Sequence, residues 1–172
     1  MRHTIAIANQ KGGVGKTTTA VNLSAALAAT KRKVLLVDLD PQGNASTAAG
    51  ANKNEKTLFE VYTQNLPIQD SILKSSGGYD VVPGGENLIA LEVAIRNQRK
   101  QGELKKLLTT LDYDFIILDT PPSLNQLTLE SLFAATATLI PLQCEYYSLE
   151  GISSLINTLS LIHISEPTRH SI

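Results

Sequence analysis

The stretch NQKGGVGKTTT occupies residues 9–19 and lies between a short apolar run and a helical pattern. Three glycines stand in it, namely Gly12, Gly13 and Gly15. They allow the backbone to wrap tightly, so that successive N–H groups can point at phosphate oxygens, next to the positive end of the following helix dipole. Lys16 can reach the β- and γ-phosphates, and the Thr17 hydroxyl is placed to ligate Mg²⁺. The stretch therefore predicts a loop that binds nucleotide phosphates together with Mg²⁺.

The general phosphate-loop pattern G-x-x-x-x-G-K-[ST] fails here at its first position, where Gln10 replaces glycine. The rest of the pattern matches, and the strand–loop–helix context is the one that the motif requires. The alternative is a glycine-rich turn with accidental lysines. Lys11 places a second cation in the loop. The alternative interpretation of Lys11 is an ordinary solvated surface lysine.

The composition is that of an ordinary globular protein. The chain has 172 residues, of which 42% are hydrophobic and 18% are charged, and its formal net charge is −1. This length suits one domain with a buried core. The single cysteine excludes a disulfide framework, and no apolar stretch of the sequence is long enough to span a membrane. The chain also has no net positive charge that would attract it to nucleic acid. We expect a cytoplasmic protein.

Strand and helix patterns alternate along the chain, which is typical of βαβ units around a parallel sheet. Short apolar runs predict strands at residues 4–8, 33–37, 79–82, 115–118 and 138–142. Helical spacing of apolar residues predicts helices at residues 16–29, 86–97, 103–111 and 148–159. We expect an α/β fold with a mostly parallel sheet flanked by helices.

Three aspartates follow predicted strands: Asp38, Asp40 and Asp119. Ligands of open α/β sheets bind at the carboxyl ends of the strands, so these side chains are candidates for the same site as the loop. Each has a simpler alternative. Asp38 and Asp119 could cap helices, and Asp40, which precedes Pro41, could form a turn.

The segment KGGVGKT at residues 11–17 resembles the deviant Walker A motif of the ParA/MinD superfamily of P-loop ATPases. Three further segments agree with this family and are similar to its ParA/Soj-like partition ATPases: VLLVDLDPQGN at residues 34–44, FIILDTPPS at residues 115–123 and PLQCEYYSLEG at residues 141–151. The resemblance extends from Ile5 to about Leu159 and implies a P-loop NTPase fold of the deviant Walker A type.

The resemblance implies a role for each matching residue, with ATP and Mg²⁺ as the cofactors. The nucleotide would be bound by Lys11, Gly12, Gly13, Val14, Gly15, Lys16, Thr17 and Thr18. The metal site would comprise Thr17, Asp38 and Asp119, with Asp119 acting through water. The catalytic residues would be Lys11, Lys16 and Asp40, of which Lys11 reaches the partner's ATP and Asp40 orients the attacking water.

The function implied by the resemblance is that of a switch ATPase for chromosome or plasmid partitioning. ATP would drive homodimerisation, the dimer would bind DNA non-specifically, and a ParB-like partner would stimulate hydrolysis to ADP and phosphate at the nucleoid. The alternative is a MinD-like membrane-cycling regulator, but residues 161–172 do not resemble its lysine- and leucine-rich amphipathic helix. We therefore expect no membrane partner.

The C-terminal end departs from the family pattern. We expect a partial ATPase domain at residues 1–160, incomplete at its C-terminal end, and an unrelated tail at residues 161–172. Residues 163–172 show no apolar period, and Pro167 blocks a helix. The family continues with further strand–helix units that carry DNA-binding residues, so we expect DNA binding to be lost and solubility to be poor. A natural short tail is the alternative.

Overall fold

The computed structural model describes residues 2–51, 56–98, 102–143 and 148–164. Six strands of these residues form one sheet in the order β3-β4-β2-β5-β1-β6. Only β3 runs antiparallel to its neighbour, β4. The strands are β1 (His3–Ile7), β2 (Val34–Asp38), β3 (Leu73–Lys74), β4 (Asp80–Val82), β5 (Phe115–Asp119) and β6 (Ala137–Leu139). The mostly parallel α/β fold is confirmed.

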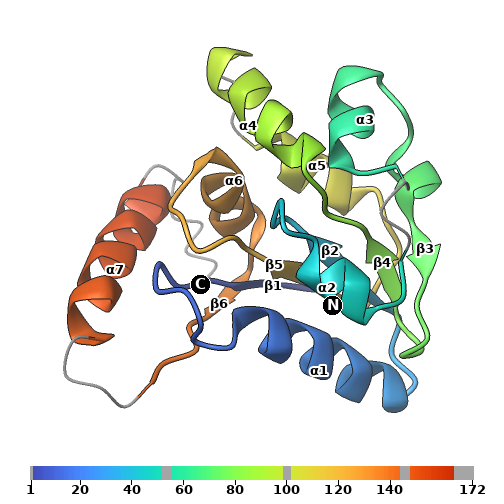
Figure 1. Ribbon diagram of the computed structural model, residues 1–172, viewed down its shortest axis with the longest axis horizontal. Helices are drawn as coiled ribbons and strands as arrows, with labels where there is room; N and C mark the ends of the chain where they lie inside the picture. The colour runs from blue at the N-terminus through green and yellow to red at the C-terminus, as the bar shows by residue number, and fades with distance from the viewer. Residues whose placement is uncertain (1, 52–55, 99–101, 144–147, 165–172) are drawn as a thin grey trace, which may run out of the picture.

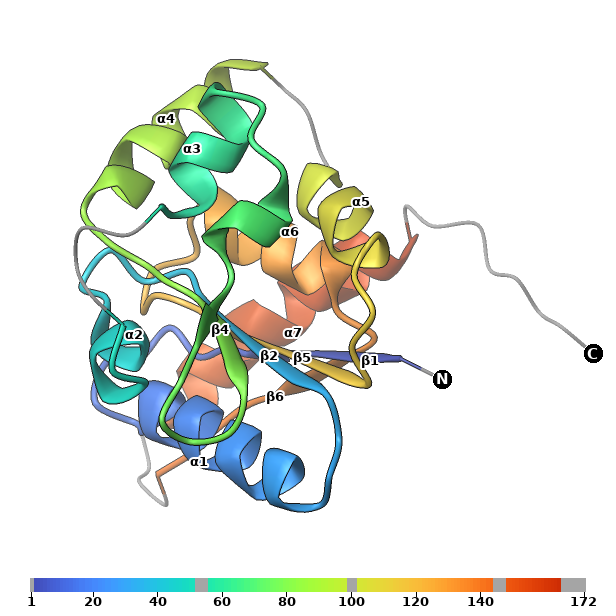
Figure 2. The ribbon, with the colours of Figure 1, turned by 90° about the vertical axis from the view of Figure 1, so that its right-hand side faces the viewer.

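Helices cover both faces of the sheet. Figures 1 and 2 show α1 and α2 on one face, α3 to α6 on the other, and α7 beside α6. The helices are α1 (Lys16–Ala29), α2 (Asn44–Ala48), α3 (Leu58–Thr63), α4 (Asn87–Gln98), α5 (Glu103–Thr109), α6 (Gln126–Ala134) and α7 (Ser148–Ile164), with a 3₁₀ turn at Ile68–Ser71. This three-layer arrangement exposes the loops that follow the parallel strands at one edge.

The central strands are buried on both faces and divide the core in two. In β2, Leu35 and Val37 join the larger cluster under α3 to α7, whereas Val34 and Leu36 join the smaller cluster under α1 and α2. This alternation follows from the two-residue period of a strand. Because both faces are covered, β2 reads in the sequence as a continuous apolar run.

Several elements differ from the sequence predictions. The strand β6 ends at Leu139, before Pro141, and is shorter than expected. Helix α7 continues to Ile164, past the expected end at residue 159, so the first four residues of the expected tail are helical. Residues 165–172 lie outside the described part of the chain. Among the described helices, none is long and apolar enough to cross a membrane.

Candidate functional site

The loop between β1 and α1 has the backbone conformation of an anion-binding loop. Gly13 and Gly15 have φ values of 74° and 88°, in the left-handed region that L-residues with side chains rarely adopt. Gly15 is the N-cap residue of α1, and no side chain of the described residues caps this helix end. The first amides of a helix have no partner within the helix, so an anion can bind them.

Lys16 is held inside this loop by the chain itself. Its side chain is buried, and Nζ donates a hydrogen bond to the backbone oxygen of Lys11 at 3.0 Å. Burial lowers the pKa of Lys16, whereas the carboxylates of Asp119 and Asp40 act in the opposite direction. The cation is therefore fixed in position next to the acidic side chains before any ligand binds.

Asp119 ends β5 and is completely buried. Among the described residues, neither of its carboxylate oxygens has a hydrogen-bond partner. Burial raises its pKa from the ordinary value of 3.8 to about 7, and Asp38 and Asp40 add to this effect. The Thr17 hydroxyl favours the ionised form without reaching standard hydrogen-bond geometry. A buried carboxylate without partners is costly, and a cation or a water held by one would relieve that cost.

Asp38 is buried as deeply as Asp119 but its oxygens are occupied. Oδ2 accepts hydrogen bonds from the backbone N–H of Ser46 at 2.8 Å and from its hydroxyl at 2.6 Å. Oδ1 accepts one from the backbone N–H of Asp40 at 3.1 Å. These bonds favour the ionised form, but burial has the larger effect and raises the pKa of Asp38. Asp38 therefore holds the end of β2 and the start of α2 together.

Asp40 forms the turn that the sequence allowed, and it also faces the loop. Its Oδ1 accepts a hydrogen bond from the backbone N–H of Gln42 at 2.9 Å, which closes a turn over Pro41. Asp40 lines a cavity of about 700 Å³ together with Lys16 and Thr17. Turn formation and a role in this cavity are therefore compatible.

The cavity brings together most, but not all, of the predicted residues. Its walls include Gly12, Gly13, Gly15, Lys16, Thr17, Thr18 and Asp40. The walls do not include Lys11, Val14, Asp38 or Asp119. Lys11 is partly buried at the edge of the loop, and its backbone N–H donates to Asn9 Oδ1 at 2.9 Å.

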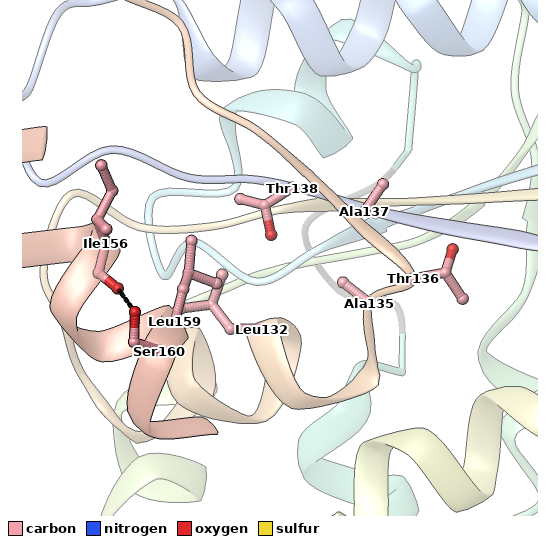
Figure 3. A pocket seen from close by; sticks show the side chains of 8 residues that line it. All are labelled: Leu132, Ala135, Thr136, Ala137, Thr138, Ile156, Leu159 and Ser160. Atoms are coloured by element: carbon pink, nitrogen blue, oxygen red, sulfur yellow. Dashed lines mark hydrogen bonds between the residues drawn. The ribbon is translucent and has the colours of Figure 1, made fainter. Parts of the chain in front are cut away.

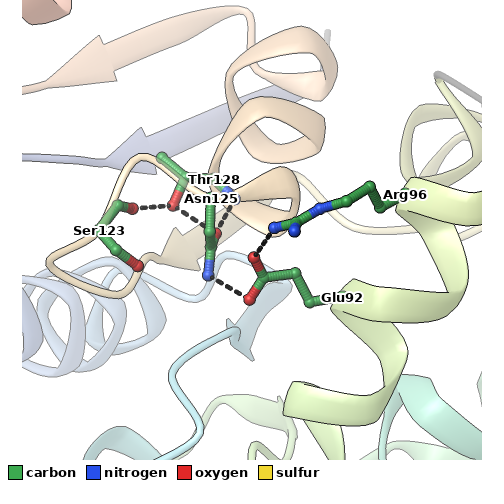
Figure 4. Close-up of polar contacts among 5 residues, drawn as sticks. All are labelled: Glu92, Arg96, Ser123, Asn125 and Thr128. Atoms are coloured by element: carbon green, nitrogen blue, oxygen red, sulfur yellow. Dashed lines mark hydrogen bonds and ion pairs between the residues drawn. The ribbon is translucent and has the colours of Figure 1, made fainter.

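Sequence reasoning missed the wall of the cavity opposite the loop. Glu92 on α4 accepts hydrogen bonds from Asn125 at 3.1 Å and from Arg96 at 3.2 Å, as Figure 4 shows. Asn125 caps α6 and accepts a hydrogen bond from the Thr128 N–H at 2.9 Å. Asparagine directly before a helical run is an N-cap signal that could have located the start of α6. Nothing in the sequence indicates the contact between Glu92 and Asn125.

A different cavity, of about 440 Å³, lies between β6, α6 and α7 (Figure 3). Its lining consists of Leu132, Ala135, Thr136, Ala137, Thr138, Ile156, Leu159 and Ser160. None of these side chains carries a charge. The cavity around the glycine loop is therefore the better candidate for chemistry on a charged ligand.

The chain is similar to known proteins over most of its length. A family model described as an AAA domain matches residues 2–172. Chromosome partitioning protein ParA of Myxococcus xanthus is 48% identical over 164 residues, which are 92% of this chain and 58% of that protein. Chromosome-partitioning ATPase Soj of Treponema pallidum is 41% identical, and the match covers 100% of this chain and 69% of that protein.

A solved structure shows the same architecture with ligands bound. Cobyrinic acid a,c-diamide synthase from Mycobacterium smegmatis, with a bound ATP analogue and magnesium, matches with a TM-score of 0.87 and 35% identity. The match covers 95% of this chain and 69% of that one. The present chain thus spans between 58% and 69% of the length of these three proteins.

Proposed function

Because the chain belongs to the ParA/Soj family of P-loop ATPases, we propose that it binds ATP with Mg²⁺ and hydrolyses it as a dimerising switch in chromosome or plasmid partitioning. The observation that carries this proposal combines the start of α1 with Lys16 and Asp119. Among the described residues, no side chain caps this helix start and no group bonds the Asp119 carboxylate, which interacts electrostatically with the fixed Lys16 cation. The ATP analogue and magnesium in the Mycobacterium smegmatis structure support the choice of ligands.

The residues present fit Mg²⁺ bound through a nucleotide. The described residues contain no group of three or more His, Cys, Asp or Glu side chains that could hold a metal ion alone. Mg²⁺ commonly uses few protein ligands and completes its shell with phosphate oxygens and water. The Thr17 hydroxyl would hold the ion directly, and the Asp119 carboxylate would hold it through water. When bound, the ion would neutralise charge on the phosphates.

Hydrolysis would then depend on the position of Asp40. Asp40 follows β2 and lines the 700 Å³ cavity, where its carboxylate would orient a water for attack on the γ-phosphate. Lys16 would stabilise the charge that develops on the transferred phosphoryl group. We place Asp38 as the support of Asp40, since its oxygens already accept three hydrogen bonds.

We propose that Lys11 acts on the ATP of a second copy of the chain. Its side chain does not line the cavity of its own subunit, although its backbone oxygen holds Lys16 there. A ParB-like activating protein is the partner that the proposed cycle requires. The names of the Myxococcus xanthus and Treponema pallidum relatives support partitioning over a membrane-cycling function.

Light scattering and phosphate release with Mg-ATP test the proposal together. We expect the parent chain to dimerise and release phosphate, Lys11→Ala to bind ATP as a monomer, and Asp40→Ala to remain an ATP-bound dimer. Lys106→Ala, which removes an exposed lysine paired with Glu103 on α5, is the matched control and should behave like the parent. Dimerisation of Lys11→Ala at the parental level would rule out the role across subunits, and parental turnover by Asp40→Ala would rule out its role in hydrolysis.

A further inference from the structure

A buried serine connects the two acidic positions at the end of β2 to a loop on the neighbouring strand. The Ser46 side chain on α2 donates its hydroxyl hydrogen to Asp38 Oδ2 at 2.6 Å. The same oxygen of Ser46 accepts the backbone N–H of Gly84, in the loop between β4 and α4, at 2.8 Å. Ser46 is 5% exposed, so water cannot easily replace either bond.

The other carboxylate oxygen of Asp38 bonds to the backbone of Asp40. Asp38 Oδ1 accepts the backbone N–H of Asp40 at 3.1 Å. A continuous series of hydrogen bonds thus runs from Gly84 through Ser46 and Asp38 to the backbone of Asp40. The series begins in the loop that follows β4 and ends in the loop that follows β2. It therefore fixes these two loops relative to each other.

The loop at Gly84 also supports this position by direct contact. A Cβ atom placed on Gly84 would lie 2.7 Å from the backbone oxygen of Asp40 and 2.8 Å from the carboxyl carbon of Asp38. These distances are shorter than real contacts of a Cβ atom, so only glycine fits without movement. The backbone at Asp40 is therefore held by a hydrogen bond from Asp38 and by packing against Gly84.

We infer that Ser46 is a positioning residue for ATP hydrolysis, acting through Asp38 on the water-orienting carboxylate of Asp40; this inference rests on the proposed function. Ser46 does not line the 700 Å³ cavity around the glycine loop, so it does not contact the phosphates there. It lines instead a separate cavity of about 510 Å³ between α2 and the start of α4. Its removal should therefore affect the rate of hydrolysis and leave the affinity for ATP intact.

The test is a comparison of kcat, KM and the directly measured Kd for Mg-ATP. In Ser46→Ala, we expect kcat to fall at least about tenfold, because small displacements of a positioning group cost one to two orders of magnitude in rate. The Kd should stay within about twofold, because the loop that binds the phosphates is unchanged. Ser46→Thr, which keeps the hydroxyl, should restore most of kcat.

Thr47→Ala is the matched control, since it removes a neighbouring hydroxyl on the same helix, and within the described part of the chain this hydroxyl bonds only to the backbone oxygen of Gly43, at 3.0 Å. It should keep the parental kcat. Equal kcat in folded Ser46→Ala and parent overturns the inference, as does an equal loss in Thr47→Ala. If Ser46→Ala does not fold, Ser46→Cys is measured instead, because cysteine is close to serine in size but donates a weaker hydrogen bond. A parental kcat in Ser46→Cys would then overturn the inference. A parent chain without ATPase activity overturns the proposed function and this inference with it.

Discussion

Replacing Asp119 by asparagine should stabilise the ligand-free chain in a pH-dependent way. Asp119 is 0% exposed, its oxygens have no partner among the described residues, and burial raises its pKa from 3.8 to about 7. The folded state therefore holds a proton that the unfolded state has released. Stability falls as pH rises from about 4 to about 7, because the folded carboxyl must ionise at a cost.

The size of this effect follows from the pKa values. A difference of one pH unit between the two pKa values corresponds to about 1.4 kcal/mol, so the full cost above pH 7 is about 4 kcal/mol. Between about pH 5 and pH 8 the free energy of unfolding of Asp119→Asn should rise relative to the parent by roughly 3 kcal/mol. The amide has its own cost in a buried site, but that cost does not vary with pH and cancels in the comparison.

Urea unfolding at about pH 5, 6, 7 and 8, with a chelator and without nucleotide, measures this difference. Asp112→Asn is the control, because Asp112 is an exposed carboxyl whose pKa is lowered by its bond to Lys33. Ionised Asp112 stabilises the fold fully at any pH above the pKa that it has in the unfolded chain. The difference in the free energy of unfolding between Asp112→Asn and the parent should therefore stay constant across this range. A difference for Asp119→Asn that also stays flat, within about 0.5 kcal/mol, would refute the account of Asp119 as an unpartnered buried acid.

Two further changes test the loop and the scaffold. Gly15→Ala forces a residue with a side chain into the left-handed conformation (φ 88°), which should destabilise the fold by about 1–2 kcal/mol. Calorimetry should therefore show a lower Tm, and titration should show weaker ATP binding. Gly12→Ala, at a position without positive φ and with open space around it, should keep the parental Tm, and an equal loss there would contradict the explanation. Glu130→Ala removes the buried carboxylate that accepts the backbone N–H groups of Gly102 and Leu104, and urea unfolding should show a loss of about 1–3 kcal/mol. An unchanged midpoint would show that α5 does not need this cap.

The sequence was most informative where the local pattern alone determines the structure. The glycines before Lys16 and the apolar run of β2 predicted the loop, the start of α1 and the order of the first elements, and the structure confirms these elements. Helix α2 was missed because its five residues, Asn44–Ala48, show no apolar period and its start depends on Gly43 in a left-handed conformation.

The finer arrangement of the site depends on contacts between distant residues. Ser46 bonds Asp38 from a separate helix, and Glu92 bonds Asn125 from 33 positions away. Such pairs follow from the packing of complete elements, which local patterns do not encode. The sequence placed Asp38 and Asp119 in equivalent positions, whereas the structure shows one carboxylate saturated with hydrogen bonds and the other without partners among the described residues.

Calorimetric titration of the chain with ATP in the presence of Mg²⁺ tests the central claim most directly. Lys16 is the cation that the loop itself fixes, so the parent chain and the Lys106→Ala control should bind ATP, and Lys16→Ala should not. Each protein should show the same Tm within about 2 °C, so that the loss reflects the site and not the fold. ATP binding by Lys16→Ala with parental affinity, or no binding by the parent chain, would contradict the assignment of the loop as a nucleotide site.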